Sequence, residues 1–378
     1  MRLSLRNSAA DISSRCNECG LCREECGFLQ KHGLPKLIAD SYDPFEEKRL
    51  GIPFECSLCG LCSAVCPQGL DPAGMFLDMR REAVDRSVNF AGHSGILKYE
   101  RRGTSRRYSY YALPEGCDTV LFPGCALPGS KPDKVIALFE HIRKDLPSLG
   151  IVLDCCTKPS HDLGRERSFH LMFGELRDYL IGQKVKTVLV ACPNCHKVFR
   201  TYGEGLQVKT VYEVLAERGL PERNPLSDRV VTIHDPCSVR FNSDIHSAAR
   251  AIISKIGLTI NEMNHSRENT VCCGEGGTVG CLSPDLAGRW GSIRKTEAEG
   301  HLTVTYCAGC TSFLGRVTPT IHLVDLVFEP DAAICGKIKI SRAPFTYLNR
   351  LMLKRRFRKN MKAKVSRERC LPPDDISF

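Results

Sequence analysis

The eight residues from Thr270 to Gly277, T-V-C-C-G-E-G-G, place two cysteines side by side, Cys272 and Cys273. A disulfide between neighbouring residues is strained, because the two side chains point apart and the short ring distorts the peptide bond. Two adjacent free thiols also have no obvious use in packing. The pair is suited to binding different atoms of one metal cluster, whereas it is a poor ligand set for a single tetrahedral zinc ion.

Cysteine is unusually abundant in the chain, with 22 cysteines in 378 residues. Small secreted proteins use such cysteines as disulfide staples, but a chain of this length can bury an adequate core without them. The N-terminal residues contain no apolar run long enough for a signal peptide, and no stretch of 18 consecutive apolar residues predicts a transmembrane helix. We therefore expect a cytoplasmic protein whose thiols bind metal in a reducing compartment.

The cysteine pair is one part of a constellation that the sequence contains twice. Each copy has a single cysteine, then an adjacent pair, then a C-x-x-C motif. The candidate metal ligands are Cys125, Cys155, Cys156, Cys192 and Cys195 in the first copy, and Cys237, Cys272, Cys273, Cys307 and Cys310 in the second. Between the pair and the C-x-x-C motif lie 35 intervening residues in the first copy and 33 in the second, which indicates an internal duplication with a period of about 113 residues.

Short β-rich runs precede these cysteines and alternate with helical stretches, which predicts βα units around parallel sheets. Residues 119–122 lead to Cys125, for example, and residues 187–190 lead to Cys192. The carboxyl ends of parallel strands converge on one crevice, and the N-terminus of the following helix stabilises a thiolate there. We therefore expect the five thiolates of each copy to face one another.

Two cysteine runs near the N-terminus follow the spacing C-x-x-C-x-x-C-x-x-x-C, which is the bacterial ferredoxin pattern for two [4Fe–4S] clusters. In this pattern the fourth cysteine of each run binds the cluster of the other run. The predicted ligands are Cys16, Cys19, Cys22 and Cys66 for the first cluster, and Cys56, Cys59, Cys62 and Cys26 for the second. Zinc sites favour separated C-x-x-C pairs, so a zinc protein is disfavoured. The first run ends in Gly27 where the second has Pro67, which is a slight departure.

The C…C-C…C-x-x-C arrangement resembles the cysteine-rich CCG domain of heterodisulfide reductases and related iron–sulfur oxidoreductases. Two ferredoxin runs followed by two such domains are similar to the D-type subunit of heterodisulfide reductase, and to the iron–sulfur subunits of anaerobic glycerol-3-phosphate dehydrogenase and glycolate oxidase. The resemblance spans about residues 10–330 and rests on eighteen cysteines. It implies a noncubane [4Fe–4S] cluster in each complete five-cysteine set, at which a disulfide is cleaved. Thr157 stands where the motif has a glycine, as at Gly274, and we expect it to alter the turn without removing a ligand.

The expected fold is an α+β multidomain arrangement. A helical ferredoxin-like domain with two [4Fe–4S] clusters at residues 1–91 is followed by an exposed linker at residues 92–116. Two Rossmann-like α/β CCG domains come next, at residues 117–226 and 227–335, and a basic C-terminal tail occupies residues 336–378. Four cysteines lie outside the repeated sets and are interpreted as packing or exposed thiols, namely Cys117, Cys281, Cys335 and Cys370.

Positive charge is concentrated in the tail. The formal net charge is +10, and residues 350–369, with ten basic residues and one acidic residue, contribute +9 of it. The remainder is nearly neutral, so nucleic-acid binding is not indicated. Apolar residues four apart among the basic ones predict a basic amphipathic helix, at Leu353, Phe357, Met361 and Val365. Peripheral docking on the cytoplasmic membrane face or on a partner subunit, and a solvated, partly disordered end, are both compatible with this pattern.

Two other motifs are set aside. The stretch C-P-N-C-H at residues 192–196 matches the c-type haem attachment motif, but such attachment requires export. The glycine-rich residues 274–280 match neither the dinucleotide nor the phosphate-loop motif, and no flavin or nicotinamide motif is found elsewhere. We interpret these glycines as allowing close approach of the backbone to a cluster.

The sequence thus predicts an iron–sulfur oxidoreductase that passes electrons through ferredoxin-type clusters to CCG clusters, which reduce or form a disulfide. The alternative is a non-catalytic electron-transfer subunit between a flavin dehydrogenase and a quinone or membrane partner. Either role requires a protein that gives or takes electrons, such as a flavoprotein, a hydrogenase or a membrane cytochrome or quinone subunit. The first role adds a small thiol or disulfide substrate. His161, His234 and Asp235 are candidate proton donors, although histidines satisfied by backbone hydrogen bonds are the more ordinary interpretation.

Overall fold

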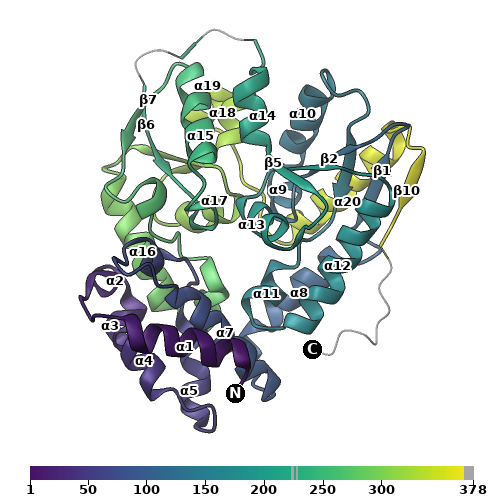
Figure 1. The fold of residues 1–378 in the computed structure, drawn as a ribbon. Helices are drawn as coiled ribbons and strands as arrows, with labels where there is room; N and C mark the ends of the chain where they lie inside the picture. Colours follow the sequence, from purple (N-terminus) through teal and green to yellow (C-terminus); the bar gives the residue numbers. More distant parts are fainter. Residues whose placement is uncertain (223–224, 227–228, 370–378) are drawn as a thin grey trace.

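The structure is a computed structural model and describes residues 1–222, 225–226 and 229–369 (Figure 1). Its first 90 residues contain helices and turns and no strand, in agreement with the expected helical region. The helices are α1 (Leu3–Arg15), α2 (Leu21–Glu24), α3 (Gly27–His32), α4 (Pro35–Ser41), α5 (Glu47–Gly51), α6 (Leu61–Ala64) and α7 (Pro72–Asp85), with the 3-10 turn η1 (Ile52–Glu55).

Helix α7 illustrates how this part is held together. The Asp71 carboxylate accepts a hydrogen bond from the Gly74 backbone N–H at 3.1 Å and so caps the helix N-terminus. Met75, Phe76 and Met79 recur at helical spacing on one face, and all three are buried against α1 in a single apolar cluster. Six of the eight ferredoxin-type cysteines belong to this cluster or pack against it, so the apolar core and the cysteine loops form one packed unit.

The middle of the chain forms two sheets, one for each copy of the cysteine constellation. Their strand orders are β10-β1-β3-β2-β4-β5 and β7-β6-β8-β9, and all pairs are parallel except the two that β1 makes. The strands are β1 (Tyr110–Leu113), β2 (Thr119–Phe122), β3 (Gly150–Leu153), β4 (Thr187–Val190), β5 (Gln207–Thr210), β6 (Val230–His234), β7 (Thr259–Glu262), β8 (Leu302–Thr305), β9 (Thr320–His322) and β10 (Val365–Arg367). The order β3-β2-β4-β5 recurs as β7-β6-β8-β9, so the duplication in the sequence is also a duplication of the fold.

Helices flank both sheets (Figure 1). They are α8 (Ser94–Gly103), α9 (Ala126–Ser130), α10 (Pro132–Arg143), α11 (Lys158–Asp162), α12 (Glu166–Gly182), α13 (Pro193–Tyr202), α14 (Val211–Arg218), α15 (Ser243–Lys255), α16 (Pro284–Glu297), α17 (Ala308–Leu314), α18 (Leu323–Phe328), α19 (Pro330–Ile334) and α20 (Phe345–Asn360), with 3-10 turns η2 (Ala91–His93), η3 (Cys237–Val239), η4 (Arg267–Asn269) and η5 (Gly276–Cys281). One apolar cluster includes Leu121 and Leu189 of the first sheet and Ile233 and Val304 of the second, so the two halves share a core. The mixed helix and sheet architecture is as expected, and the Rossmann-like description of each half stays a prediction.

The expectation of an exposed linker at residues 92–116 is wrong. This segment forms α8 and then β1, which pairs antiparallel with β3. Tyr111 is fully buried and donates a hydrogen bond to the Asp154 carboxylate at 2.5 Å, while the Arg367 guanidinium lies 4.4 Å from its ring centroid. The tyrosines of this segment, Tyr108, Tyr110 and Tyr111, are therefore buried against the sheet and the tail, whereas Arg101, Arg102, Arg106 and Arg107 are exposed.

The predicted tail helix is present as α20, but its apolar stripe does not face outward. Leu353, Phe357 and Met361 are buried in the shared core, and the Phe357 ring packs 5.1 Å from that of Phe139. Strand β10 then pairs with β1 and extends the first sheet. Residues 345–369 of the basic tail are therefore not a solvated, partly disordered end, and the apolar stripe that could have served for membrane or subunit docking is used for packing. Cys370 lies outside the described residues.

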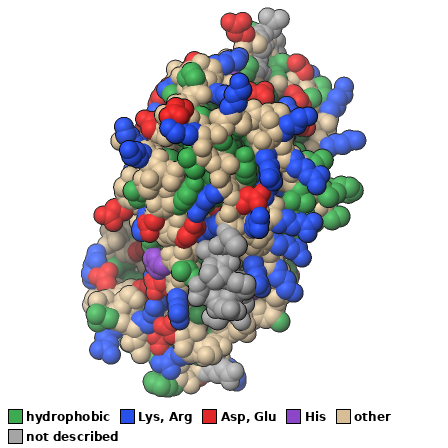
Figure 2. All heavy atoms as spheres, turned by 90° about the vertical axis from the view of Figure 1, so that its right-hand side faces the viewer, with side chains coloured by type: hydrophobic (Ala, Val, Ile, Leu, Met, Phe, Trp, Pro, Cys, Tyr) green, Lys and Arg blue, Asp and Glu red, His purple; other side chains and the backbone are tan. Residues whose placement is uncertain are grey.

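The solvent-facing side of α20 carries basic residues together with the exposed apolar side chains of Phe345, Leu348 and Met352. Figure 2 looks at the side of the molecule on which α20 and β10 lie in Figure 1, and many Lys and Arg side chains gather there around smaller hydrophobic areas. Within the described part of the chain, none of the helices combines the length and the apolar character that crossing a bilayer requires.

Candidate metal centres

Two cavities in the ferredoxin-like part are each lined by one of the predicted sets of four cysteines. One is lined by Cys16, Cys19, Cys22 and Cys66, and the other by Cys26, Cys56, Cys59 and Cys62. Each set therefore takes three thiols from one run and the fourth from the other. Cys62 lines both cavities, so the two sites share a wall. Cys19 is exposed whereas Cys56 and Cys62 are buried, so the first site lies nearer the surface.

These thiols cannot all ionise without a compensating cation. Burial, together with Cys16 and other neighbours, raises the pKa of the Cys22 thiol to about 11. Burial and Cys59 raise the pKa of Cys26 to about 12, and burial raises that of Cys62 well above its ordinary value. Metal binding removes this penalty, because a coordinated thiol is deprotonated. Four sulfur donors around one cavity are the donor set of a [4Fe–4S] cluster, so the residues fit that group.

The five cysteines of the first copy meet at the carboxyl ends of three neighbouring strands. Cys125 follows β2, the pair Cys155 and Cys156 follows β3, and Cys192 precedes α13 after β4. The Cys195 thiol donates a hydrogen bond to Cys156 Sγ at 3.3 Å. A hydrogen bond from Cys155 holds the pKa of Cys125 at about 7, below its usual value. The predicted convergence of strand ends thus gathers these thiols at one place, which we call the first cysteine-rich site.

Helices α8 and α20 complete the surroundings of this first site. The Tyr99 hydroxyl donates a hydrogen bond to the Cys125 carbonyl at 3.1 Å, and a Cβ on Gly103 would lie 3.1 Å from Cys155 Cβ. Arg350 is only 4% exposed, lies 5.6 Å from the Tyr99 ring centroid and helps to lower the pKa of Cys125. Sequence reasoning missed these residues, because they belong to segments interpreted as a linker and a tail. The interleaving of tyrosine with arginine was the available signal.

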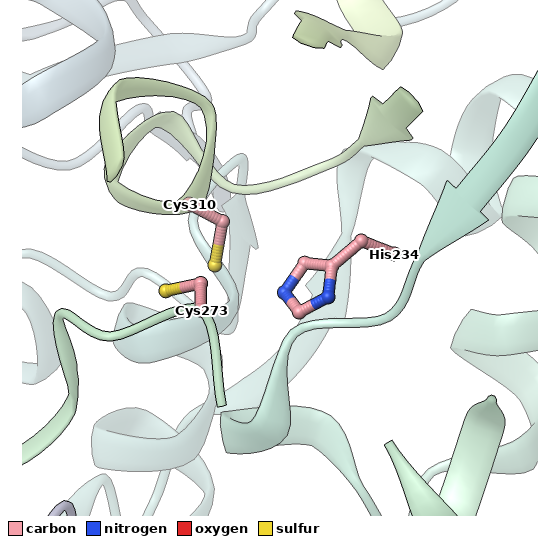
Figure 3. Close-up of side chains that lie close together, drawn as sticks. All are labelled: His234, Cys273 and Cys310. Atoms are coloured by element: carbon pink, nitrogen blue, oxygen red, sulfur yellow. The ribbon is translucent and has the colours of Figure 1, made fainter. Parts of the chain in front are cut away.

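The five cysteines of the second copy form an equivalent second cysteine-rich site. Cys272 raises the pKa of Cys237, and Cys272 and Cys310 lower the pKa of Cys273 to about 6, so these thiols lie close together. Figure 3 shows that His234, the last residue of β6, points its imidazole toward Cys273 and Cys310. One ligand atom from each of these three buried residues lies within 4.8 Å of the others. Five converging thiols fit an iron–sulfur cluster here as well.

The turn after each cysteine pair has the same hand in both copies. Thr157 adopts the left-handed conformation with φ 56°, and Gly274 does so with φ 105°. Both cysteines of each pair stay at their site, as expected from the sequence, although a β-branched residue rarely adopts this conformation. In the second copy, a Cβ at Gly277 would lie 2.4 Å from the Cys56 carbonyl oxygen. The close approach expected for this glycine-rich stretch is therefore to the loop that carries Cys56.

The second cysteine-rich site borders the ferredoxin-like part. A small apolar cluster contains Leu61, Val271, Cys272 and Trp290, and Cys26, Cys59 and Cys237 pack against it. The Trp290 indole N–H donates a hydrogen bond to Ser57 Oγ at 3.1 Å, and the Arg240 guanidinium donates to the Cys59 carbonyl at 3.1 Å. Cys59 is close enough to Cys237 for one thiolate to raise the pKa of the other thiol, after the larger effect of burial.

The two cysteine-rich sites also touch each other. The Cys192 and Cys307 thiols lie close enough to shift each other's pKa: Cys195 and then Cys307 lower that of Cys192, and Cys192 raises that of Cys307. The Tyr212 hydroxyl lies 2.8 Å from the carbonyl oxygen of Ala191 and 2.7 Å from that of Tyr306, the residues that precede these cysteines. The four cysteine sites consequently form a row. The ferredoxin-like site of Cys19 comes first, followed by the ferredoxin-like site of Cys59, then by the second cysteine-rich site and finally by the first cysteine-rich site.

Ionisable side chains lie between the two cysteine-rich sites. The Lys158 ammonium pairs with the Asp162 carboxylate, and it is near enough to interact with the charges of Cys156 and Cys237, one from each site. Burial and the thiolate of Cys192 raise the pKa of the Glu275 carboxyl to about 7. Sequence reasoning did not single out Lys158 or Glu275, because nothing in their local pattern shows that two distant loops meet.

The three candidate proton donors have different surroundings. His161 is held by side chains, with Nδ1 at 2.9 Å from the Asp162 carboxylate and Nε2 at 2.9 Å from the Tyr202 hydroxyl. Asp235 accepts hydrogen bonds from the Arg250 guanidinium at 2.8 and 3.0 Å, so it serves as a structural anchor. His234 has no hydrogen-bond partner among the described residues, so the backbone interpretation does not hold for it.

The cysteines outside the repeated sets lie as expected where they are described. Cys117 is buried and its thiol donates a hydrogen bond to the Thr119 carbonyl at 3.3 Å, whereas Cys281 and Cys335 are exposed.

Two protein families match parts of the chain. Residues 12–70 match the family described as a 4Fe-4S dicluster domain, and residues 231–315 match the CCG family, described as a cysteine-rich domain. The B-type subunit of fumarate reductase (CoM/CoB) from Methanothermobacter marburgensis is 26% identical over 84% of this chain and 72% of its own length. The D-type subunit of dihydromethanophenazine:CoB–CoM heterodisulfide reductase from Methanosarcina mazei is 26% identical over 73% of this chain and 80% of its own. EtfAB:quinone oxidoreductase of Syntrophomonas wolfei is 24% identical over 69% of this chain and 36% of its own.

The matched regions contain the cysteines around which the structure builds its sites. Residues 12–70 hold all eight ferredoxin-type cysteines, and residues 231–315 hold the complete second cysteine-rich set. The chain spans about two thirds of the length of some curated relatives, 66% in the case of the corresponding heterodisulfide reductase subunit from Methanosarcina barkeri. The chain is an iron–sulfur electron-transfer protein of the CCG type, similar to the D-type subunit of heterodisulfide reductase.

Proposed function

We propose that this protein reduces a disulfide, or forms one in the reverse direction, at its two cysteine-rich sites, and exchanges electrons through its two ferredoxin-like sites. The observation that carries the proposal is the close approach of the two five-cysteine sites at Cys192 and Cys307, where the Tyr212 hydroxyl lies 2.8 and 2.7 Å from the carbonyl oxygens of the two preceding residues. Lys158 and Glu275 lie near enough to both sites to interact with their thiols. Reducing a disulfide to two thiols consumes two electrons and two protons. Two neighbouring redox sites can each supply one of the two electrons, and the ionisable side chains between them can supply protons.

The proposed ligands follow from the four cysteine sets. Cys16, Cys19, Cys22 and Cys66 would hold one [4Fe–4S] cluster, and Cys26, Cys56, Cys59 and Cys62 a second. The first and second cysteine-rich sites would each hold one noncubane [4Fe–4S] cluster, through Cys125, Cys155, Cys156, Cys192 and Cys195, and through Cys237, Cys272, Cys273, Cys307 and Cys310. When bound, such clusters accept and release electrons one at a time. An adjacent cysteine pair in each of the last two sets allows neighbouring thiolates to reach different irons.

The fold contributes to electron transfer by placing these sites in a defined order. Cys19 is exposed, so a partner protein can approach the first ferredoxin-like site directly. The apolar cluster around Cys59 and Cys237 keeps water out of the boundary with the second cysteine-rich site. The close approach of Cys192 and Cys307 then joins the last two sites. We therefore expect the electron-exchanging partner to bind near Cys19.

Protons and substrate would meet at the other end of this row. Lys158 and Glu275 place an ammonium and a carboxyl group beside sulfur atoms of both cysteine-rich sites, where a cleaved disulfide needs its protons. The relatives named as parts of heterodisulfide reductase and of CoM/CoB fumarate reductase support a small thiol or disulfide as the substrate. A flavoprotein, a hydrogenase or a membrane cytochrome or quinone subunit would be the redox partner.

A second candidate is a relay without a substrate of its own, between a flavin dehydrogenase and a quinone-linked partner. The relative named EtfAB:quinone oxidoreductase favours it. In that role the row of sites would serve only to carry electrons between two proteins, and Lys158 and Glu275 would have no role in proton delivery.

Disulfide turnover distinguishes the two functions. The reconstituted, full-length protein is reduced anaerobically with a viologen dye, a panel of small disulfides is added, and released thiols are counted against electrons consumed. We expect two thiols for every two electrons, and a loss of more than tenfold in Lys158→Gln with cluster reduction by the dye unchanged. The matched control is Lys144→Gln, which removes an exposed lysine and should have no effect. Full reduction by the dye with no disulfide consumed would favour the relay.

A further inference from the structure

The imidazole of His234 closes the second cysteine-rich site on the side of β6 (Figure 3). A ring nitrogen of His234 and the sulfur atoms of Cys273 and Cys310 all lie within 4.8 Å of one another. Cys310 comes from α17 and Cys273 from the loop after β7, so three separate elements direct these atoms to one point. His234 is fully buried, at 0% exposure, and both cysteines are buried as well.

Neither ring nitrogen of His234 has a hydrogen-bond partner among the described residues. A neutral imidazole carries one donor and one acceptor, and leaving both unpaired in the protein interior is destabilising. The charged neighbours do not hydrogen-bond to the ring: Asp235 binds the Arg250 guanidinium at 2.8 Å, and Arg294 binds Glu297 at 2.5 Å. The fold thus holds the imidazole of His234 beside two thiols, and no other described group forms a hydrogen bond with its ring nitrogens.

The first half has a hydrocarbon ring at the equivalent position. Phe122 lies opposite Val190 in the first sheet, and His234 lies opposite Thr305 in the second. Each residue stands three places before the single cysteine of its copy, and its cross-strand partner stands two places before the C-x-x-C motif. The duplication therefore presents an imidazole in the second half where the first presents a phenyl ring.

The surroundings of Phe122 match those of His234. Phe122 belongs to an apolar cluster with Cys156 and Cys195, and these are the counterparts of Cys273 and Cys310. Its ring packs edge-on against Phe199, with the ring centroids 5.1 Å apart. A phenyl ring satisfies this place by packing alone, and it has no atom that can bind a metal. The two sites consequently differ by one donor atom while sharing all five cysteines.

We propose that His234 binds iron at the second cysteine-rich site through a ring nitrogen, so that this site has a mixed sulfur and nitrogen ligand set and the first has sulfur alone. The inference rests on the proposed presence of a cluster at the second site. Imidazole is an established ligand of iron–sulfur clusters in Rieske centres, where it replaces cysteine on one iron and raises the reduction potential. The two cysteine-rich sites are then expected to differ in reduction potential despite their common origin.

Pulsed EPR on the full-length, reconstituted protein tests this ligand directly. The protein is produced with ¹⁵N-labelled histidine in a Cys155→Ser background, which removes a ligand of the first cysteine-rich site. The reduced clusters are examined for hyperfine coupling to histidine nitrogen. We expect a coupling of the size of a directly bound nitrogen, its loss in His234→Phe, and a shift in the midpoint potential of the same signal. Iron content should be unchanged in His234→Phe, because the five cysteines remain.

The reciprocal exchange is the matched variant. Phe122→His in a Cys272→Ser background should introduce a histidine coupling at the first cysteine-rich site. Where His234→Phe fails to fold, His234→Gln serves the same purpose, because an amide side chain also removes the imidazole coupling. A full iron complement at the second site with no coupling to histidine, or with only the small coupling of a hydrogen-bonded ring, overturns the His234 inference alone. A second site that binds no iron overturns the proposed cluster assignment as well.

Discussion

The two cysteine-rich halves share strand order, cysteine positions and the hand of the turn after each cysteine pair, but they differ in what covers them. The first half is covered by α8 and α20, which place Tyr99 and Arg350 beside Cys125. The second is covered by the ferredoxin-like part, which brings Cys59 next to Cys237. The first carries Phe122 where the second carries His234.

The duplication therefore gives both halves the same set of candidate metal ligands. The segments that pack against each half differ, so we expect the two sites to have different roles in electron transfer. The second half faces the ferredoxin-like part, so it is placed to exchange electrons with it. The first half faces a basic helix and a buried arginine, so negative charge is favoured beside its cysteines. Substitutions in the two halves, and at the link between them, probe this division of roles.

Loss of a ligand from one of the two halves should have unequal consequences. Cys272→Ser and Cys155→Ser are each expected to lower the iron content by about four per chain, from a total of about 16. Only Cys272→Ser should also prevent an electron-donating partner from reducing the other cysteine-rich site, because the second site lies between the ferredoxin-like part and the first. Iron and sulfide assays with freeze-quench EPR measure both effects. Equal reduction kinetics of the remaining sites in the two variants would contradict the order of the row.

Helix α20 should stabilise the first half through the side chains on its buried face. Leu353 is 1% exposed and Met352 is 55% exposed. We expect Leu353→Ala to lower the free energy of unfolding by about 2–5 kcal/mol, because it opens a cavity in the shared core. Met352→Ala should change it by less than about 0.5 kcal/mol. Anaerobic denaturant titration of the holoprotein compares the two variants. A larger loss of unfolding free energy in Met352→Ala than in Leu353→Ala would show that α20 does not bury the face that carries Leu353.

The turn after each cysteine pair allows a reciprocal exchange. A Cβ at Gly274 would lie 2.7 Å from the Ala287 carbonyl oxygen, so Gly274→Thr should lower the free energy of unfolding by about 1–3 kcal/mol. Thr157→Gly should change it by less than about 1 kcal/mol, because relief of the left-handed conformation offsets the greater freedom of glycine in the unfolded chain. The same titration measures both. A well-tolerated Gly274→Thr would mean that the two turns are interchangeable.

The link between the halves should respond more weakly. The Tyr212 hydroxyl lies between the carbonyl oxygens of Ala191 and Tyr306. Tyr212→Phe should lower the free energy of unfolding by about 0.5–1.5 kcal/mol, the usual net value of such a hydrogen bond. It should leave iron content and disulfide turnover intact, because no ligand is removed. Loss of iron from either site in Tyr212→Phe would show that this hydroxyl does more than join the two halves.

The parts of the molecule that sequence analysis anticipated are those that metal geometry constrains locally. Three thiols within seven residues can bind one cluster only in a few ways, so the crossed ferredoxin sets were predictable, and the structure gathers them as expected. The β-rich run before Cys125 was visible for a similar reason, because parallel strands in a covered sheet are continuously apolar.

The missed parts depend on contacts between residues far apart in the chain. Tyr111 is buried because β10, near the C-terminal end, pairs with β1 and Arg367 packs over the Tyr111 ring. No local sequence pattern predicts that pairing. The basic character of residues 350–369 suggested a free surface, yet Arg369 is buried and forms an ion pair with Asp154 at 3.2 Å. The difference between Phe122 and His234 was present in the sequence, but its meaning required knowing that both rings are buried at the same register.

Disulfide chemistry at the cysteine-rich sites is tested most directly by EPR of the anaerobically purified, oxidised protein, recorded with and without small thiols at a full iron complement. If substrate sulfur reacts at these sites, a new paramagnetic signal should appear only when thiol is present, and it should be lost in Cys155→Ser or Cys272→Ser. Spectra that no thiol changes would contradict disulfide chemistry at these sites and leave the relay as the function of the protein.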